Sequence, residues 1–390
     1  MVKVAVVAEY YPRAADPVLG VWAHRQALAA RDAGAEVRVL VLHRPIPPQA
    51  ALRARDPKAL LAPLRQPLHA ELDGLSVTYV PFVAPSYAST YERWGAWAAP
   101  PLALALRALR RRFPFDLVHA HYAAPAGDAV RRALPGVPLV VSSHGGDVLA
   151  TAQRSPRARA TVERAFGHAR LVIANSAGTE RRARELGARR TRIVHLGTDI
   201  GEAAAAPDPC PTLVTVGHLV PRKRHADVVH ALALLRDRHP DLRYVVVGDG
   251  PERANIAALA AELGVADRVE LRGQLPPHEA AAVARAATAF VLPSTEEAFG
   301  VAYIEAMAGG VPAVGAQGED GPEEIAATGG GIVLTPPGDP TALAATLDRL
   351  LTDGAWRGEL SRAARATVVE HFTWERCGRE TVAAYEDALR

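Results

Sequence analysis

Short apolar runs rich in valine, isoleucine and leucine alternate with helical patterns from one end of the chain to the other. Nearly unbroken apolar strands separated by helices are typical of a parallel sheet that is covered on both faces. The helices predicted in the first half include Val21–Ala33, Ala126–Leu134 and Thr179–Leu186. The strands predicted there are Val2–Ala8, Glu36–Leu42, Ser76–Val80, Asp116–Ala120, Pro138–Ser143, Leu171–Ala174 and Arg192–His195.

The stretch 201–211 is rich in alanine and proline, lacks periodicity and is typical of a linker. After it the alternation starts again and ends in a helix predicted over Trp374–Leu389. The strands predicted in this second half are Thr212–Val216, Tyr244–Val247, Val269–Arg272, Ala289–Leu292, Val311–Gly315 and Ile332–Leu334.

These elements predict an α/β chain of two doubly wound, Rossmann-like domains, 1–200 and 212–372, joined by the linker 201–211. We expect the helical segment 373–390 to pack back on the first domain. Since sheets of this kind bind ligands at the carboxyl ends of their strands, we expect the site in a cleft between the two domains.

Composition changes this picture little. The chain has 390 residues and a formal net charge of +3, with its arginines spread over many segments, so we do not expect it to bind nucleic acid. No run of about 18 uncharged apolar residues is present to span a membrane. Two isolated cysteines predict neither a disulfide framework nor a zinc site, and we expect a cytoplasmic protein.

One segment suggests contact with the inner face of a membrane. A basic run near Arg110 follows aromatic residues that include Trp94 and Trp97. Such a pattern suits a membrane surface or a lipid-linked acceptor. A solvated helix face with tryptophans packed in the core explains it equally simply, and we favour that interpretation slightly.

The strongest chemical signal is the string that runs from Pro293 to Met307. A strand ends at Pro293, a loop carries Glu297, and a helix begins near Gly300 with Glu305 inside it. Carboxylates accept hydrogen bonds from hydroxyls, and free amides at a helix start hold anions or hydroxyl oxygens. The alternative interpretation is that Glu297 is a solvated loop residue and Glu305 an ordinary helix residue, neither of which binds a ligand.

A second signal follows the first strand of the second half. Gly217 allows a ligand to approach the backbone, and the run Arg222, Lys223 and Arg224 places positive charge where a diphosphate would bind. A basic surface loop before a helix is the alternative.

The first half carries a histidine signal. His144 and Asp147 lie in Ser-Ser-His-Gly-Gly-Asp, directly after a strand, and Gly20 opens the first predicted helix. His119 and His121 suggest a metal, but we expect them on opposite faces of their strand. The chain has no Asp-x-Asp triplet, so we predict no metal site.

Taken together, these segments resemble the retaining family 4 glycosyltransferases of the GT-B fold, and bacterial surface-polysaccharide members, such as those of teichuronic acid assembly, most of all. The resemblance implies an acceptor-side N-terminal domain and a donor-binding C-terminal domain. Glu297 and Glu305 match the family's E-x7-E pair, which implies that Glu297 binds the transferred hexose and Glu305 the ribose. Phe299, Gly300 and Val301 match the loop at the donor sugar.

The resemblance also assigns the phosphate groups. It implies that Lys223 binds the diphosphate and that Gly20 and Gly217 lie close to the donor. His218 stands where the family carries an arginine, and Arg222 or Arg224 is expected to compensate.

His144 matches the histidine that reaches the hexose. We therefore predict His144, Glu297 and Lys223 as catalytic residues, with Asp147 and His121 as further contacts to the hexose or the acceptor.

The predicted activity is transfer of a hexose, with retention of configuration, from a UDP- or GDP-sugar to a hydroxyl of a sugar, a lipid-linked acceptor or a small molecule. It would serve polysaccharide, glycolipid or glycosylated-metabolite synthesis and need no cofactor or metal. Two alternatives stay open: a sugar-nucleotide epimerase of the same fold, which the Glu297–Glu305 string disfavours, and a non-catalytic nucleotide-sugar-binding protein.

Overall fold

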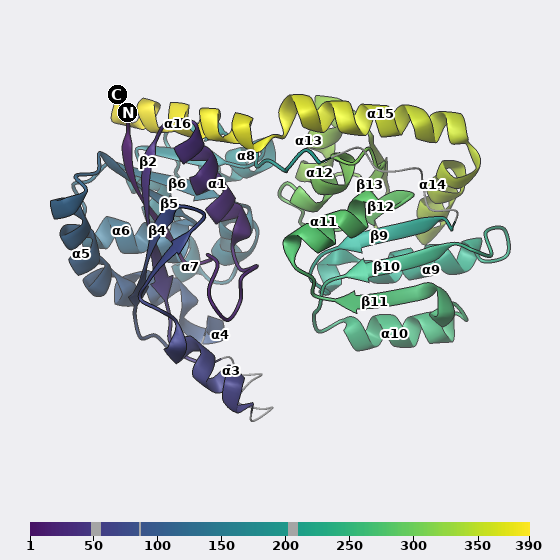
Figure 1. The fold of residues 1–390 in the computed structure, drawn as a ribbon, viewed down its shortest axis with the longest axis horizontal. Helices are drawn as coiled ribbons and strands as arrows, with labels where there is room; N and C mark the ends of the chain where they lie inside the picture. The colour runs from purple at the N-terminus through teal and green to yellow at the C-terminus, as the bar shows by residue number, and fades with distance from the viewer. Residues whose placement is uncertain (48–55, 86, 202–209) are drawn as a thin grey trace. The chain divides into compact units, whose positions relative to one another are not determined.

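The computed structural model describes residues 1–47, 56–85, 87–201 and 210–390. The chain divides into two compact units, and Figure 1 draws the strands and helices of each. The N-terminal unit comprises Met1–Leu196 together with Trp374–Arg390, and the C-terminal unit comprises Gly197–Thr373. Most of the predicted linker 201–211 lies outside the described residues.

The N-terminal unit contains an eight-stranded sheet in the order β3-β4-β2-β1-β5-β6-β7-β8, counted over the described residues. Every neighbouring pair is parallel except β3 and β4. Its central strands are fully buried, which explains their continuous apolar sequences. The strands are β1 Lys3–Ala8, β2 Glu36–His43, β3 His69–Leu72, β4 Leu75–Pro81, β5 Leu117–His121, β6 Leu139–Ser143, β7 Leu171–Ala174 and β8 Thr191–Ile193.

Strand β3 departs from the prediction of purely parallel strands. It pairs antiparallel with β4 through a tight turn at Asp73 and Gly74, whose φ angles are 49° and 78°. A two-residue hairpin turn requires positive φ at both positions, and Asp-Gly supplies it. Because β3 is a short edge strand with partly exposed side chains, it has no apolar run that would reveal it.

Helices α3, α7 and α8 of this unit each begin at a residue whose side chain accepts a hydrogen bond from the first turn. Ser155 Oγ accepts a hydrogen bond from the Ala158 amide at 3.1 Å, and Pro156 occupies the first helical position of α7. The helices are α1 Val21–Asp32, α3 Pro57–Leu61, α4 Tyr87–Thr90, α5 Trp94–Arg112, α6 Asp128–Ala133, α7 Pro156–His168, α8 Ala177–Glu185 and α16 Trp374–Leu389. Short helical turns are η1 Ala62–Arg65, η2 Tyr91–Arg93, η3 Ala123–Gly127, η4 Gly146–Ala150 and η5 Thr151–Gln153.

The aromatic and the basic side chains of α5 differ in burial. Trp94 lies in the core of the N-terminal unit, and Trp97 packs against that core. Arg110 and Arg112 near the end of α5 are exposed. Over the described ranges, no helix combines the length and the apolar character needed to cross a membrane.

Helix α16 packs on α1 through one apolar face. The buried positions Cys377, Gly378, Thr381, Ala384, Tyr385 and Ala388 follow a helical repeat. Gly378 makes the closest approach, since a Cβ at that position would lie 2.1 Å from the Ala29 carbonyl oxygen.

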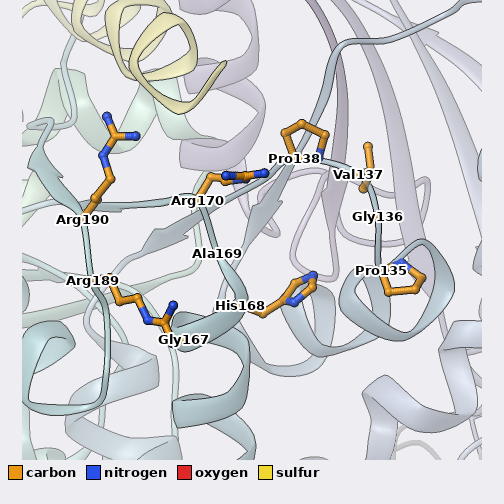
Figure 2. A pocket seen from close by; sticks show the side chains of 10 residues that line it. All are labelled: Pro135, Gly136, Val137, Pro138, Gly167, His168, Ala169, Arg170, Arg189 and Arg190. Atoms are coloured by element: carbon orange, nitrogen blue, oxygen red, sulfur yellow. The ribbon is translucent and has the colours of Figure 1, made fainter. Parts of the chain in front are cut away.

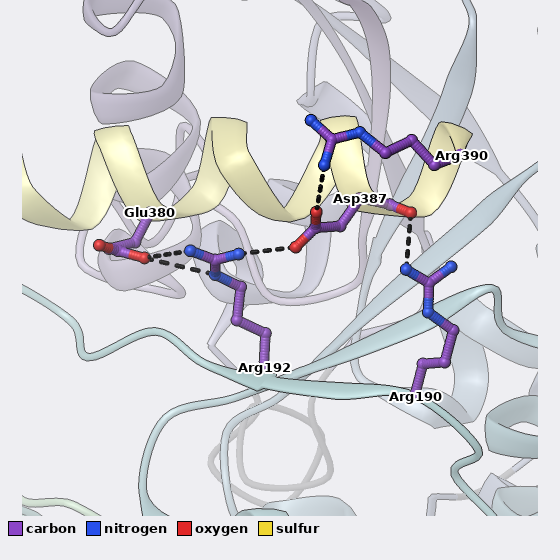
Figure 3. A network of polar contacts seen from close by, with 5 residues as sticks. All are labelled: Arg190, Arg192, Glu380, Asp387 and Arg390. Atoms are coloured by element: carbon purple, nitrogen blue, oxygen red, sulfur yellow. Dashed lines mark hydrogen bonds and ion pairs between the residues drawn. The ribbon is translucent and has the colours of Figure 1, made fainter.

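Ion pairs fix the other side of α16 to β8, as Figure 3 shows. The Arg192 guanidinium contacts Asp387 at 2.6 Å and Glu380 at 2.7 Å. Arg190 donates to the Asp387 carbonyl at 2.9 Å. The packing and the charges together make α16 part of the N-terminal unit.

The C-terminal unit contains a parallel sheet in the order β11-β10-β9-β12-β13-β14. The strands are β9 Thr212–Val216, β10 Arg243–Val247, β11 Val269–Gly273, β12 Ala289–Leu292, β13 Ala313–Ala316 and β14 Ile332–Thr335. The helices and short turns are η6 Pro221–Lys223, α9 His225–Leu235, α10 Arg253–Glu262, η7 Ala266–Arg268, α11 Pro277–Arg285, α12 Val301–Met307, α13 Asp320–Thr328, α14 Pro340–Thr352 and α15 Gly354–His371. The prediction of two doubly wound α/β domains is confirmed.

The close contact at Gly378 leads to a prediction. We expect Gly378→Ala to lower the free energy of unfolding by about 1–3 kcal/mol, because the new methyl group must displace the backbone of α1. Gly358→Ala in α15 is the matched control, since its Cβ would meet only the flexible end of Arg362 at 3.6 Å. The control should be neutral or stabilising by up to about 1 kcal/mol. Urea denaturation measures both, and equal stability of the two variants would contradict the packing described for α16.

Candidate functional site

In the C-terminal unit, the sheet order brings two distant loops together. From β9 the chain builds the sheet in one direction, through β10 and β11. It then returns to the other side of β9 and continues in the opposite direction through β12, β13 and β14. The point between β9 and β12, where the order reverses, is a topological switch point. Ligands bind beyond the carboxyl ends of the strands at such points. The two loops touch there, because the Thr295 amide donates to the Arg222 carbonyl at 2.8 Å.

Lys223 and Glu297 form an ion pair across these loops. The Lys223 Nζ lies 2.6 Å from Glu297 Oε2, with side chains only 12% and 10% exposed. Ser294 Oγ donates to the same oxygen at 2.8 Å. Burial alone would raise the pKa of Glu297, but the charge and hydrogen bond of Lys223, with help from Ser294, hold it below its usual value. Glu297 is therefore a carboxylate at neutral pH.

Two further contacts hold the backbone of Glu297. Its amide donates to Glu319 Oε2 at 2.9 Å, and its carbonyl accepts from the Gly321 amide at 3.0 Å. Glu296, just before it, has a positive φ of 55°. The sequence interpretation missed Glu319 and Ser294. Ser294 lies inside the string already singled out, whereas Glu319 lies more than twenty residues from Glu297 and carries no motif.

The basic run separates into three different environments. Lys223 contacts Glu297, while Arg224 turns away and pairs with Asp227 at 2.6 Å. Arg222 is exposed, and its Nη1 reaches the Glu296 carbonyl at 3.5 Å. Arg224 thus forms an ion pair with a carboxylate, whereas the charge of Arg222 acts on Glu297 and helps to lower the pKa of that carboxyl.

Gly217 and His218 lie beside this run. A Cβ on Gly217 would be 3.8 Å from Lys223 Cε, so the glycine lies directly against the lysine side chain. The His218 side chain is exposed. The structure thus places Gly217 and Lys223 together and leaves His218 at the surface.

The residues after Glu297 shape the start of α12. Gly300 has a φ of 88°, and a Cβ there would lie 2.4 Å from the Tyr303 ring, so only glycine fits. Val301 is the first helical residue. The Phe299 side chain is buried against Phe372, and the residue as a whole is only 1% exposed.

Glu305 lies on α12 without a hydrogen bond to its carboxylate from any described residue. Burial raises its pKa to about 7, against the opposing charge of Arg285. The Arg285 guanidinium instead donates to the backbone carbonyls of Glu305, at 3.3 Å, and Asp199. Arg285 is a further residue that the sequence interpretation missed, and a single arginine at the end of a helix gives no signal.

In the N-terminal unit, the carboxyl ends of β5 and β6 bring His121 and His144 together. His121 Nδ1 lies 2.9 Å from His144 Nε2. His121 is 1% exposed, whereas His144 is partly exposed. Trp22, which the sequence interpretation missed, has its ring 6.4 Å from that of His144.

The expectation that His119 and His121 point to opposite faces was wrong. Successive strand residues alternate, so residues two apart share a face, and the two ring centroids are 4.5 Å apart. Both nitrogens of His119 are occupied, by Tyr385 Oη at 2.8 Å and Ser142 Oγ at 2.7 Å. Within the described residues, no group of three or more histidine, cysteine or acidic side chains is arranged to hold a metal ion.

Asp147 and Gly20 hold the loops around these histidines. Asp147 is fully buried and accepts from the Ala123 amide at 2.8 Å, which joins the turn after β6 to the turn after β5. Burial raises the pKa of Asp147 to about 7. Gly20 has a φ of 65°, and a Cβ there would lie 2.2 Å from the Tyr10 carbonyl carbon. Its role in the structure is to let two backbone segments cross.

A cavity of about 470 Å³ lies at the opposite edge of this sheet, where the chain enters β6, β7 and β8 (Figure 2). Arg170, Arg189, Arg190 and His168 line it, and none of the predicted site residues does. The carboxyl ends of α6 and α7 meet this edge, and their partial negative charge is complemented by these basic side chains. The positive charge here thus has a structural explanation.

Comparisons with known proteins agree with this architecture. A family model described as "Glycosyltransferase Family 4" matches residues 19–202, and one described as "Glycosyl transferases group 1" matches residues 199–367. The 2-deoxystreptamine glucosyltransferase of Streptomyces kanamyceticus is 32% identical over 75% of this chain and 83% of its own length. A D-inositol 3-phosphate glycosyltransferase of Frankia alni is 32% identical over 75% of this chain and 80% of its own.

Solved structures show the same fold. Sucrose-phosphate synthase from Thermosynechococcus elongatus superposes with a TM-score of 0.80 at 22% identity, covering 99% of this chain and 98% of that one. Anabaena HepE in complex with UDP gives a TM-score of 0.72 at 20% identity, covering 99% and 100%.

Two Rossmann-like units with these likenesses define a glycosyltransferase of the GT-B fold. Within that class, the chain belongs to the family 4 glycosyltransferases.

The ion pair of the C-terminal unit leads to a second prediction. Lys223→Met should lower the free energy of unfolding by about 3–5 kcal/mol at neutral pH, because it leaves the Glu297 carboxylate buried without its cation. The double variant Lys223→Met/Glu297→Gln should recover a large part of this loss. Since the pKa of Glu297 is lowered in the folded protein, the difference between wild type and Lys223→Met should shrink as pH falls through that pKa. A pH-independent difference in urea denaturation would show that the pair does not carry the effect.

Proposed function

We propose that this glycosyltransferase transfers a hexose from a UDP- or GDP-sugar to an acceptor hydroxyl, with retention of configuration at the transferred carbon. The observation that carries the proposal is the buried Lys223–Glu297 pair at the switch point between β9 and β12. A cation and a carboxylate held together at this position suit a diphosphate and the hydroxyls of a sugar.

In this proposal, Lys223 stabilises the departing diphosphate. Negative charge grows on the diphosphate as the glycosidic bond breaks, and a cation already in place stabilises that charge without reorganisation. Glu297, whose carboxylate also accepts from Ser294, holds the ammonium before any ligand arrives. Arg222, whose charge also acts on Glu297, adds to the positive field at the same loop.

Hydroxyl recognition falls to the carboxylates. Glu297 has one oxygen engaged by both Lys223 and Ser294, which leaves the other to accept from a hexose hydroxyl. Glu305, without a hydrogen bond to its carboxylate, would accept from the ribose hydroxyls. His144 in the N-terminal unit would position the hexose, as the family resemblance implies.

The proposal requires no metal ion. Lys223 and Arg222 supply the positive charge that a divalent cation supplies to a diphosphate elsewhere. As acceptors, the names of the relatives favour 2-deoxystreptamine and D-inositol 3-phosphate among the compounds to be tested first.

The test is a panel of UDP- and GDP-sugars, each incubated with these two acceptors and with sugar and lipid-linked acceptors. We expect acceptor-dependent release of nucleoside diphosphate and a product with the anomeric configuration of the donor. Conversion of the donor to another sugar nucleotide without acceptor would indicate an epimerase. Binding without turnover would indicate a non-catalytic protein. Lys223→Ala should weaken binding of the diphosphate sugar much more than binding of the bare nucleoside.

A third prediction concerns pH and Glu305. Since ribose hydroxyls donate to the ionised carboxylate, a bound nucleoside should lower the pKa of Glu305 from its free value of about 7. Affinity for uridine or guanosine, which carry no phosphate, should therefore rise as pH increases through the bound-state pKa and level off above about 7. A shift of one pKa unit corresponds to about tenfold in affinity.

Calorimetry between pH 5.5 and 8 measures this effect. Glu305→Gln should bind more weakly at pH 8 and show no such rise, whereas the exposed Glu262→Gln on α10 should behave like wild type. Parallel curves for wild type and Glu305→Gln would remove Glu305 from the ribose site.

A fourth prediction concerns metal dependence. Treatment with EDTA should leave the transfer rate unchanged, because the charges that stabilise the diphosphate in this proposal belong to side chains. Loss of transfer on chelation, with recovery on addition of magnesium or manganese, would contradict the proposed role of Lys223 and Arg222.

A further inference from the structure

The turn at Glu296 and Glu297 has a backbone shape that its own residues do not favour. Glu296 has a φ of 55°, in the left-handed region that residues other than glycine rarely adopt. Its side chain is exposed. The shape matters, because the next residue carries the carboxylate that lies 2.6 Å from Lys223. Contacts from outside the turn must therefore stabilise it.

Such contacts come from the segment that follows the neighbouring strand. Strand β13 lies beside β12, and Glu319 follows β13 at the start of α13. Glu319 Oε2 accepts from the Glu297 amide at 2.9 Å. Two residues later, the Gly321 amide donates to the Glu297 carbonyl at 3.0 Å. Both polar groups of the Glu297 backbone are thus bound to the segment after β13.

The Glu296 amide faces the same carboxylate. Burial raises the pKa of Glu319, and hydrogen bonds from the amides of Glu297 and Glu296 oppose this effect. Two successive amides of a turn that converge on one anion form a backbone nest, which is a common anion-binding shape. The turn is therefore an anion site that the protein fills with its own carboxylate.

Close packing fixes the place from which this carboxylate reaches the nest. A Cβ on Gly321 would lie 2.3 Å from the Phe299 carbonyl oxygen. The segment after β13 and the loop after β12 therefore touch through their backbones. This contact brings Glu319 to a defined position against the turn.

We propose that Glu319 is a positioning residue: by filling the nest at Glu296 and Glu297, its carboxylate holds the left-handed turn that points Glu297 toward Lys223. Glu319 acts on the reaction through Glu297. The effect on sugar transfer rests on the proposed function, in which the Lys223–Glu297 pair binds the donor.

Hydrogen–deuterium exchange tests the nest without any substrate. In Glu319→Ala, we expect the amides of the segment 294–299 to exchange faster by about tenfold or more. Sodium formate, a carboxylate small enough to enter the emptied nest, should restore their protection in a saturable way. Unchanged exchange in Glu319→Ala, or exchange that formate does not slow, would overturn the nest.

Glu323→Ala is the matched control. Its carboxylate accepts from the Gly318 amide at 2.8 Å, so it also binds a backbone amide of the segment after β13. We expect the segment 294–299 to exchange in Glu323→Ala as in wild type, with or without formate. Faster exchange there that equals the change in Glu319→Ala would show a general loosening of the segment and refute a specific role of Glu319.

A second variant separates the shape of the turn from the charge of Glu319. The negative charges of Glu319 and Glu297 also act on each other, so a purely electrostatic role is the alternative. Glycine adopts the left-handed region without steric cost. If Glu319 supplies the shape, Glu296→Gly should recover part of the activity that Glu319→Ala loses. If it supplies only charge, Glu296→Gly should recover nothing.

Transfer assays provide the functional measurement. We expect kcat of Glu319→Ala to fall by about 10- to 100-fold, since a misplaced carboxylate loses orientation. Formate and the second change Glu296→Gly should each restore part of it. A wild-type kcat in Glu319→Ala, or a low one that Glu296→Gly does not improve, would refute the positioning role.

Two provisions keep the outcomes distinct. Should the alanine variant fail to fold, Glu319→Gln takes its place: glutamine keeps the size but offers only a neutral oxygen, and wild-type exchange and kcat in it would refute the role. If the wild-type protein transfers no sugar from any donor, the proposed function fails, whereas the exchange measurements still decide whether Glu319 holds the turn.

Discussion

The C-terminal site depends on one requirement: a charge that is taken out of water must meet a partner of opposite charge. Lys223 and Glu297 satisfy each other at 2.6 Å although 74 positions separate them in the sequence. Their meeting is a result of sheet order, because β9 and β12 are neighbours while the chain between them forms β10 and β11. Ser294, Glu319 and Gly217 then take positions that the pair defines. The parallel sheet thus provides a frame on which two loops become one charged centre.

In the N-terminal unit, by contrast, the histidines at the strand ends contact hydroxyl groups and one another. They are kept neutral, since burial lowers the pKa of His119, His121 and His144. Neutral groups in a buried site recognise a ligand by the direction of their hydrogen bonds rather than by charge. This division suits a reaction in which one partner is a diphosphate and the other is a neutral hydroxyl compound.

Periodicity was enough to predict most of the fold, because buried parallel strands carry unbroken apolar runs that few other structures share. Strand β3 was not predicted, since its half-exposed edge residues form no such apolar run. The dipeptide Asp73-Gly74 was nevertheless a usable signal for a hairpin turn. In the site, motifs led to Lys223 and Glu297, but their contact depends on topology. No sequence motif pointed to Glu319 or Arg285. Each contacts the site from a different helix or loop, and the local sequence does not show which distant residues will come into contact. The error over His119 and His121 came from misapplied strand geometry, which predicts a shared face.

The position of α16 at the end of the chain also affects how the protein folds during translation. A ribosome completes residues 197–373, the whole C-terminal unit, before it makes Trp374–Leu389. Until then the face of α1 around Ala29, which α16 later covers, has no protein partner in the nascent chain. The first unit to start folding is therefore the last to be finished, and its exposed apolar face is a natural surface for chaperones during translation.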